Sequence, residues 1–209
     1  MPRPPRLLGA GATYHITARG NNGEVIFTDD LDRYRYLTRL AEARRAYEFR
    51  LFAYVLMSNH VHLVVQASQP NVSSAIQSIH GRHATEFNRK LGRHGHLFGG
   101  RFKARAVEGN EDLLQVTSYI HLNPVRAGLV VEPEDYSWSS FRLYLEPATA
   151  DSLVDQAPVL GILSVDVDRA RLAYVEFIRR AATVEKAGGI LVHCANQRDD
   201  VLHRGVRPS

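Results

Sequence analysis

Two histidines in the segment MSNHVHLVV, residues 57–65, are the first residues whose type and spacing suggest chemistry. In a β-strand the side chains of His60 and His62 would leave the same face, about 7 Å apart along the chain, while their apolar neighbours point to the other face. Two neutral imidazoles on one face can bind one divalent metal ion. Alternatively, they are two ordinary core histidines, each with a hydrogen-bond partner.

A metal site needs further ligands, and the sequence contains neither CxxC nor HExxH, which argues against a structural zinc site and a zinc protease. The best remaining candidates lie on a helix expected after Asn110. Tyr119 and Asn123 are four residues apart, so they would be neighbours on the surface of that helix. The amide oxygen of Asn123 would be a third ligand and would leave open positions for water and a phosphate oxygen. Alternatively, Asn123 ends the helix before Pro124, and Tyr119 is a half-buried aromatic residue.

Taken together, these residues point to an attack by tyrosine on a phosphate. A phenol is a poor nucleophile at neutral pH because its pKa is about 10. A divalent cation that polarises the phosphate makes the attack feasible and stabilises the charge of the transition state. The histidine pair on a strand, with Tyr119 and Asn123 on one side of a helix, is the set of groups that a tyrosine attack on DNA requires.

The distribution of charge favours a polyanionic partner. The 209-residue chain has a net charge of +4, but Lys and Arg outnumber Asp and Glu by 16 to 7 in residues 1–105, whereas the acids outnumber the bases by 15 to 10 in residues 106–209. The candidate DNA-binding residues are Arg82, Arg89, Lys90, Arg93, Phe98, Arg101, Phe102, Lys103 and Arg105. The cations would contact phosphates and the aromatic rings would stack on unpaired bases. Alternatively, this segment is a solvated helix face with core phenylalanines.

The overall composition, 44% apolar and 23% charged, is typical of a soluble globular protein. The single cysteine, Cys194, excludes an intramolecular disulfide and fits a reducing compartment. No stretch approaches the ~18 uninterrupted apolar residues of a membrane span. The N-terminal apolar run is too short and too rich in glycine for a signal peptide. We therefore expect a cytoplasmic protein with no membrane partner.

The pattern of apolar residues predicts an α+β protein. Strands are expected at 13–19, 50–57, 60–67 and 102–108, and helices at 28–49, 71–91, 111–123, 136–145 and 166–182. Pro124 is expected to interrupt the third of these helices. This order of elements predicts a mainly antiparallel sheet with helices on one face.

Two segments carry a resemblance to a known family. SNHVHLVV resembles the HUH signature, in which a hydrophobic residue separates two histidines, and SYIHLNPVRAGLV is similar to the tyrosine helix of the single-tyrosine HUH transposases. The branch of REP-associated tyrosine transposases is the most similar. Its Y-I-x-x-N-P-V-R run is matched by residues 119–126, and its GHL-aromatic-x-x-R-F run by residues 95–102, where Phe98 replaces a frequent tryptophan. The resemblance covers about residues 10–145.

The resemblance implies a ferredoxin-like antiparallel sheet with helices packed on it. We expect a catalytic domain at 1–146 and a C-terminal helical extension at 147–209 whose role is unassigned. The resemblance also implies a Mg²⁺ or Mn²⁺ ion, with His60 and His62 as ligands and Tyr119 as the nucleophile. Asn123 stands where related enzymes often carry a glutamine ligand, which makes it a less secure member of the set.

Such enzymes cut single-stranded DNA, often beside an imperfect hairpin, and hold the 5′ end as a phosphotyrosine that a 3′-hydroxyl then attacks. The resemblance therefore implies single-stranded or hairpin DNA as the partner, and a monomer or a homodimer as the working state. Two alternatives stay open. One is a non-catalytic relative that regulates by binding DNA hairpins, and the other is a metallonuclease in which water attacks.

Overall fold

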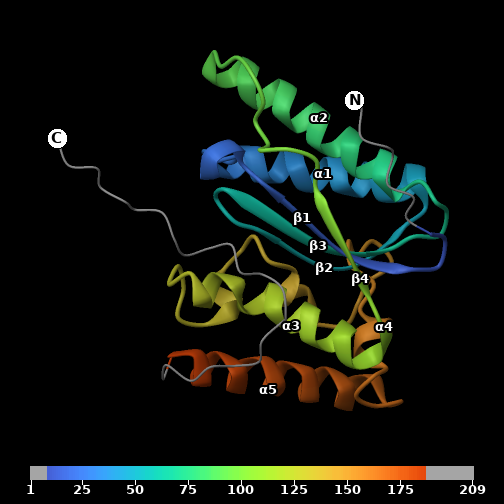
Figure 1. Cartoon of the computed structure of the whole chain (residues 1–209). Coiled ribbons are helices and arrows are strands. Elements are labelled where there is room, and N and C mark those ends of the chain that lie inside the picture. Colours follow the sequence, from blue (N-terminus) through green and yellow to red (C-terminus); the bar gives the residue numbers. More distant parts are fainter. Residues whose placement is uncertain (1–8, 187–209) are drawn as a thin grey trace.

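The strands form where β-branched and aromatic residues are concentrated in the sequence. The computed structural model describes residues 9–186 and contains a four-stranded antiparallel sheet in the order β2–β3–β1–β4 (Figure 1). The strands are β1 (Thr13–Arg19), β2 (Arg50–Leu56), β3 (His60–Gln66) and β4 (Lys103–Val107). β2 and β3 form a hairpin, and β3 pairs with β1 on its other side. The histidine pair therefore lies on a central strand.

Helices cover both faces of the sheet (Figure 1). α1 (Asp30–Tyr47) and α2 (Val72–Leu91) lie on one face, α3 (Gly109–Arg126) lies on the other, and α5 (Val167–Lys186) packs on the outer side of α3. The expectation of helices on one face only is therefore wrong. The reason is visible in β3, where Leu63 on one face and His62 and Val64 on the other are each at most 3% exposed. A strand that is buried on both sides needs a packed layer on each side.

The helices on the first face begin and end at residues that suit those positions. Asp29 caps α1 by accepting a hydrogen bond from the backbone N–H of Asp32. α2 follows Asn71 and ends at Gly92, whose φ of 60° lies in the left-handed region that favours glycine. Both limits of α2 agree with the prediction.

α3 differs from its prediction because Pro124 does not interrupt it. The helix continues to Arg126, with Pro124 in its last turn. A proline in a helix removes one backbone hydrogen bond. Because Pro124 lies in the last turn, only the end of the helix is affected and the helical conformation persists to Arg126. Tyr119, Asn123 and Arg126 consequently lie on one continuous helix.

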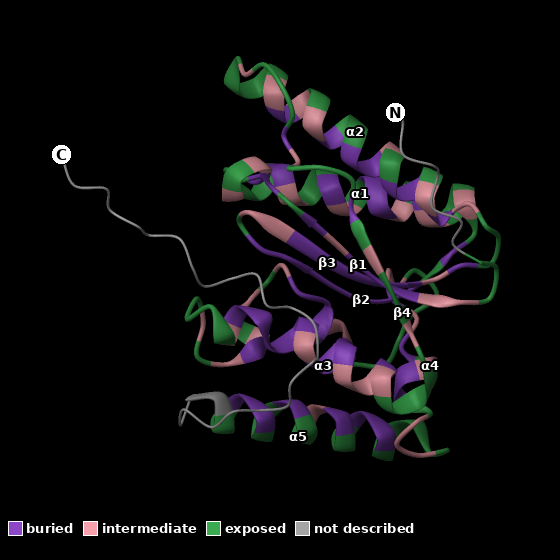
Figure 2. Ribbon diagram, viewed as in Figure 1, coloured by how far each residue is buried: buried purple, intermediate pink, exposed green. Residues whose placement is uncertain are grey.

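Beyond α3 the chain forms short elements and one long helix. These are the 3-10 turns η2 (Pro133–Asp135) and η3 (Ser140–Tyr144), then α4 (Ala157–Leu160) and α5; a further 3-10 turn, η1 (Asn21–Gly23), follows β1. The helix expected at 136–145 is thus only a 3-10 turn. Tyr174 and Ile178 of α5 are fully buried and belong to the same hydrophobic core as the sheet. Buried residues line the side of α5 that faces α3, and exposed residues lie on its outer side (Figure 2). The boundary after residue 146 stays a prediction, but the packing is continuous across it.

The expectations on the cysteine and on membrane spans have different outcomes. Cys194 and the end of the extension, 187–209, lie outside the described residues. Within residues 9–186, no helix is long and apolar enough to cross a membrane.

Candidate active site

The register between β3 and β1 sets the surroundings of the two histidines. His60 is directly opposite Arg19, and His62 is opposite Thr17, so these four side chains share one face of the sheet. The two imidazole rings are perpendicular, with their centroids 5.0 Å apart. His62 is 3% exposed, whereas His60 is half-buried. The pair thus has one buried ring and one that is more accessible.

α3 brings Tyr119 and Asn123 to this face. Asn123 Oδ1 lies 3.4 Å from His60 Nε2, and the Tyr119 ring meets the His62 ring edge-on with 5.5 Å between their centroids. The guanidinium carbon of Arg126 lies 4.9 Å from the centroid of the Tyr119 ring. The structure therefore brings together the four residues that the spacing singled out, and it adds an arginine beside the tyrosine.

A hydrogen bond to Asn59 fixes the direction in which His60 presents its lone pair. Asn59 Oδ1 lies 2.7 Å from His60 Nδ1, while the amide nitrogen of Asn59 donates to the carbonyl of Gly23. Because an amide oxygen only accepts, Nδ1 of His60 carries the proton, and Nε2 of the neutral ring is an acceptor that faces Asn123 Oδ1. Two acceptors 3.4 Å apart are an arrangement that a bound cation would stabilise.

His15 of β1 is a third imidazole in this cluster, and sequence analysis missed it. Its Nε2 lies 2.9 Å from His62 Nδ1, and the two rings are stacked with an angle of 26° between their planes. Thr17 Oγ1 lies 3.2 Å from the same nitrogen of His62. The alternation in the strand at 13–19 already put His15 and Thr17 on one face, but only the register with β3 places them beside His62.

Burial keeps both of these rings neutral. Burial, with a smaller contribution from Arg105, lowers the pKa of His15 to about 4. Burial, followed by the neighbouring His15 and His60, lowers the pKa of His62 well below its ordinary value. At neutral pH both rings are therefore uncharged, and the uncharged imidazole is the form that binds metal ions.

The donor atoms at this site fit a Mg²⁺ or Mn²⁺ ion. Nδ1 of His62 is occupied by His15 and Thr17, so its Nε2 is the nitrogen that remains for a ligand. Neighbouring ligands of an octahedral ion with bonds of ~2.1 Å are about 3 Å apart, which is close to the separation of His60 Nε2 and Asn123 Oδ1. Within residues 9–186, no group of three or more His, Cys, Asp or Glu could hold a metal ion, so a third protein ligand depends on the amide of Asn123.

At least four of the seven predicted DNA-binding cations form ion pairs with acidic residues of the same chain. The pairs are Arg82 with Glu42, Lys90 with Asp29 and Asp32, Arg93 with Glu24, and Arg105 with Asp112. Arg89 is exposed near the end of α2, close enough to Glu86 to help lower the pKa of that carboxyl, where the hydrogen bond from Arg39 has the larger effect. Much of the positive charge of α2 is thus balanced by acidic residues that lie far away in the sequence.

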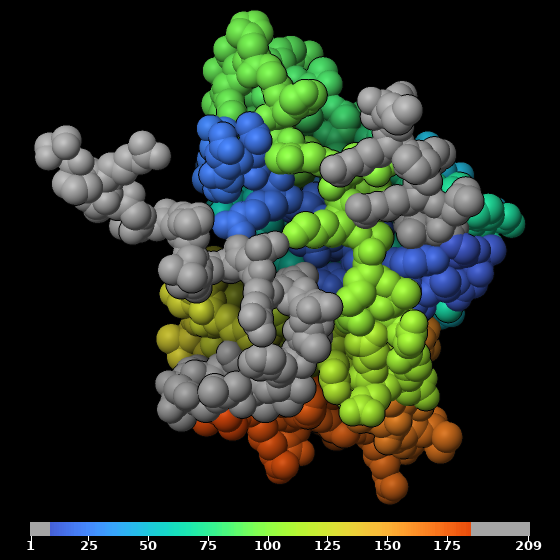
Figure 3. All heavy atoms as spheres, in the orientation of Figure 1, coloured from blue at the N-terminus to red at the C-terminus, as the bar shows by residue number. Residues whose placement is uncertain are grey.

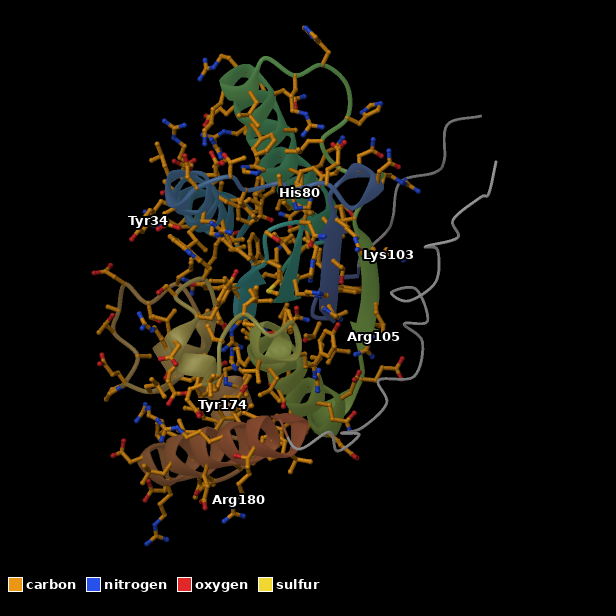
Figure 4. The ribbon with its side chains drawn as sticks, turned by 90° about the vertical axis from the view of Figure 1, so that its left-hand side faces the viewer. Tyr34, His80, Lys103, Arg105, Tyr174 and Arg180 are labelled. Atoms are coloured by element: carbon orange, nitrogen blue, oxygen red, sulfur yellow. The ribbon has the colours of Figure 1, made fainter. Side chains whose placement is uncertain are left out.

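Arg101 and Lys103, the remaining cations, lie just before and on the edge strand β4. Arg101 and Lys103 are exposed, and Lys103 and Arg105 stand on the edge strand β4 (Figure 4). In the space-filling view, β4 and the beginning of α3 form one continuous strip of surface (Figure 3). β4 thus brings the last predicted DNA-binding cations, Lys103 and Arg105, next to the beginning of α3.

The two aromatic residues of the basic segment contribute to packing. The Phe98 ring stacks on His80 with 4.5 Å between centroids, and the Phe102 ring meets the same histidine edge-on. Phe102 is only 9% exposed. Most of its ring is therefore covered by the protein in this structure, and base stacking by Phe102 stays a prediction. A phenylalanine that packs in the core and one that stacks on a base look alike in the sequence, so the sequence does not distinguish these roles for Phe98 and Phe102.

Comparison with known proteins relates the chain to a family of transposases. The family described as "Transposase IS200 like" matches residues 10–123, a span that contains His60, His62, Tyr119 and Asn123. A curated protein of Haemophilus influenzae that is named as a REP-associated tyrosine transposase is 27% identical over 108 residues, which is 46% of this chain. The chain spans 60% of the length of that relative.

A solved structure of a REP-associated tyrosine transposase bound to a REP hairpin has the same fold. It matches with a TM-score of 0.57 at 22% identity, over 74% of this chain and 94% of the other. The resemblance to REP-associated tyrosine transposases is thus confirmed by a sequence relative and by a shared fold. Because the family match covers more than half of its residues, this chain belongs to the family of IS200-like transposases.

Proposed function

We propose that this protein cuts and rejoins single-stranded DNA at hairpin-forming repeats, with Tyr119 as the nucleophile and Mg²⁺ or Mn²⁺ as the cofactor. The observation that carries the proposal is the meeting of His60 Nε2 and Asn123 Oδ1, two acceptors 3.4 Å apart, beside the phenol of Tyr119. A DNA substrate fits the family. The hairpin target is inferred from the REP hairpin bound by the structural neighbour.

The protein would carry out two transesterifications, each of which forms one P–O bond and breaks another. In the first, Tyr119 Oη attacks a phosphorus atom of the DNA, loses its proton to water and forms a bond to the 5′-phosphate. The P–O3′ bond breaks, and O3′ takes up a proton to become a free hydroxyl. In the second, a 3′-hydroxyl attacks the phosphotyrosine and loses its proton to water. The bond between phosphorus and Tyr119 Oη breaks, Oη takes up a proton, and a phosphodiester is restored. When bound, the metal ion would polarise the phosphate and stabilise its additional negative charge.

The surrounding residues would hold the reacting groups in place. Asn59 orients His60, and His15 with Thr17 orients His62, so each ring presents its Nε2 to the ligand site. The guanidinium of Arg126 beside the Tyr119 ring would stabilise negative charge on the phenolic oxygen as the proton leaves. Arg101 and Lys103 would contact the phosphates of the DNA.

The experiment is covalent capture of labelled DNA. Purified protein is mixed with single-stranded hairpin DNA labelled at either end, with Mn²⁺, Mg²⁺ or EDTA, and is separated on a denaturing gel. A protein-sized labelled band is expected with metal only, and it should disappear in Tyr119→Phe. Tyr34→Phe is the matched control, because Tyr34 is 62% exposed on α1 and lies on the opposite side from Lys103 and Arg105 (Figure 4).

The two competing functions give different results in the same experiment. A metallonuclease in which water attacks would cut the DNA without an adduct, and Tyr119→Phe would leave the cutting unchanged. A non-catalytic regulator would bind the hairpin with a steep dependence on salt but would give no adduct and no cutting with either metal.

A further inference from the structure

A buried line of hydrogen bonds joins the C-terminal helix α5 to the helix that carries Tyr119. Tyr174 of α5 places its hydroxyl 2.8 Å from Nδ1 of His121 on α3. His121 Nε2 lies 2.8 Å from the hydroxyl of Ser140 in η3. All three residues are fully buried, and Tyr174 projects from α5 into the layer that contains α3 (Figure 4).

The line ends on the backbone of β2, where two hydrogen bonds of Ser140 set the direction of the others. Ser140 Oγ accepts a hydrogen bond from the N–H of Tyr54 and donates its own proton to the carbonyl of Tyr54. Its remaining lone pair must accept the proton on Nε2 of His121. Nδ1 of the neutral His121 ring is then an acceptor, which receives the hydroxyl proton of Tyr174. Every polar group in the line is satisfied, so loss of one member leaves another buried and unpaired.

The position of His121 on α3 gives this line its importance. His121 is two residues from Tyr119 and two from Asn123, and two positions correspond to about 200° around an α-helix. His121 therefore lies on the side of α3 opposite to the side that faces His60 and His62. The ring of His121 is also packed against Phe141, Tyr144 and Tyr174.

A small rotation of α3 would be enough to disturb the active site. Side-chain atoms extend about 6 Å from a helix axis, so a rotation of about 10° moves them by about 1 Å. A displacement of about 1 Å in the reacting groups can slow catalysis by about 100-fold. The separation of 3.4 Å between His60 Nε2 and Asn123 Oδ1 leaves little room for such a shift.

We propose that α5 is a positioning element of the active site, and that Tyr174, His121 and Ser140 fix the rotation of α3 that presents Tyr119 and Asn123 to the histidine pair. The inference rests on the proposed function. It gives residues 147–186 a role: they hold α3 from its outer side.

The test compares two tyrosine-to-phenylalanine variants of the full chain. Tyr174→Phe removes the hydroxyl that binds His121. Tyr36→Phe removes an equivalent buried hydroxyl that lies 3.0 Å from His80 Nε2 on the other face of the sheet. Single-turnover adduct formation is expected to slow at least tenfold in Tyr174→Phe and less than twofold in Tyr36→Phe, while hairpin affinity stays unchanged in both. Equal rates in the two variants would overturn the proposal, because both lose one buried tyrosine–histidine hydrogen bond.

A second pair of measurements separates this inference from the proposed function. Titration with Mn²⁺ in the absence of DNA should show about tenfold weaker binding in Tyr174→Phe, since Asn123 is displaced, and wild-type binding in Tyr36→Phe. If wild-type protein binds Mn²⁺ but gives no adduct, the proposed function is contradicted. The Mn²⁺ affinities of the variants then still test the positioning role of α5. Should Tyr174→Phe fail to fold, Ser140→Ala breaks the same line at its other end with α5 intact. It should show the same loss of Mn²⁺ affinity, and unchanged affinity would overturn the proposal.

Discussion

His15 Nε2 lies 2.9 Å from His62 Nδ1, so two neighbouring strands, β1 and β3, each contribute an imidazole to one hydrogen bond. Such a bond is the common way in which a metal-binding histidine is held in one tautomer and one orientation. With Nδ1 of His62 used in this way, only its Nε2 can bind a metal ion. His15 thus acts on the site through His62 rather than by contact with substrate.

His15→Phe tests this relationship because it keeps an aromatic ring against His62 and removes the hydrogen-bond acceptor. Mn²⁺ affinity, measured by calorimetric titration without DNA, is expected to fall about 10- to 100-fold, as for other lost partners of metal-binding histidines. His15→Gln supplies an acceptor again and should recover part of the affinity. His94→Phe, at an exposed position, is the control. Unchanged affinity in His15→Phe would contradict the positioning role.

Arg126 provides a second prediction through its contact with Tyr119. Arg126 is exposed, and a cation over an aromatic ring at an exposed site contributes about 0.5–1 kcal/mol, which corresponds to a factor of about two to five in rate. Arg126→Leu should therefore slow adduct formation about two- to fivefold, while Arg126→Lys retains part of the rate. Arg142→Leu removes an exposed arginine whose side chain binds the carbonyl of Glu134, and it should leave the rate unchanged. Equal rates for Arg126→Leu and Arg142→Leu would show that the charge beside Tyr119 is not used.

The parts of the site that the sequence predicts are those determined by local geometry. The pair His60 and His62 follows from the two-residue period of a strand, and the pair Tyr119 and Asn123 follows from the four-residue neighbours of a helix. The role of His15 depends on the register between two strands, which brings His15 beside His62 although the two residues are 47 positions apart. That register is set by the packing of the whole sheet.

The features of the structure that the sequence does not reveal have a related cause. The charge of Lys90 is balanced by Asp29 and Asp32, which are 61 and 58 residues away, so counting charges along the segment cannot reveal the pairing. The layer of α3 and α5 on the second face likewise depends on tertiary packing, whereas α3 continues through Pro124 because the proline lies in its last turn.

Lys90 of α2 and Lys103 of β4 should behave differently in binding to DNA. Lys90 Nζ lies 2.7 Å from Asp29 and 2.8 Å from Asp32, and it also donates to the hydroxyl of Thr28. Lys90→Gln is therefore expected to lower the unfolding temperature by a few degrees with little change in hairpin affinity.

The measurement for this pair is hairpin affinity at several salt concentrations. A cation that contacts one phosphate contributes about 0.7–0.9 to the slope of log affinity against log salt concentration. Lys103→Gln should reduce the slope by about this amount, and Lys90→Gln should not. The reverse result would place the DNA along α2 and would mean that its ion pairs open on binding.

The last prediction concerns the stability of the fold at mildly acidic pH. His80, whose Nε2 lies 3.0 Å from the Tyr36 hydroxyl, is buried on the face of the sheet away from the candidate active site. Burial, with a smaller effect of His83, lowers the pKa of His80 to about 3. In the unfolded chain a histidine titrates near pH 6.5. The unfolded state therefore takes up a proton that the folded state refuses, and the free energy of unfolding falls as the pH drops below about 6.5.

Each such histidine contributes a slope of about 1.4 kcal/mol per pH unit in this range. His80→Gln removes one of these protons, so urea unfolding between pH 6 and pH 4.5 should show a slope smaller by about that amount, whatever the change in stability at pH 7. His94→Gln, at an exposed position, is the control. Carboxylates interfere little in this window. Burial opposes ionisation of Asp32, but hydrogen bonds from Lys90 and Thr28 outweigh it and lower the pKa to about 2, so this group contributes only below about pH 4. Equal slopes in His80→Gln and wild type would mean that the folded protein accepts the proton on His80, and that the contact with Tyr36 opens before the protein unfolds.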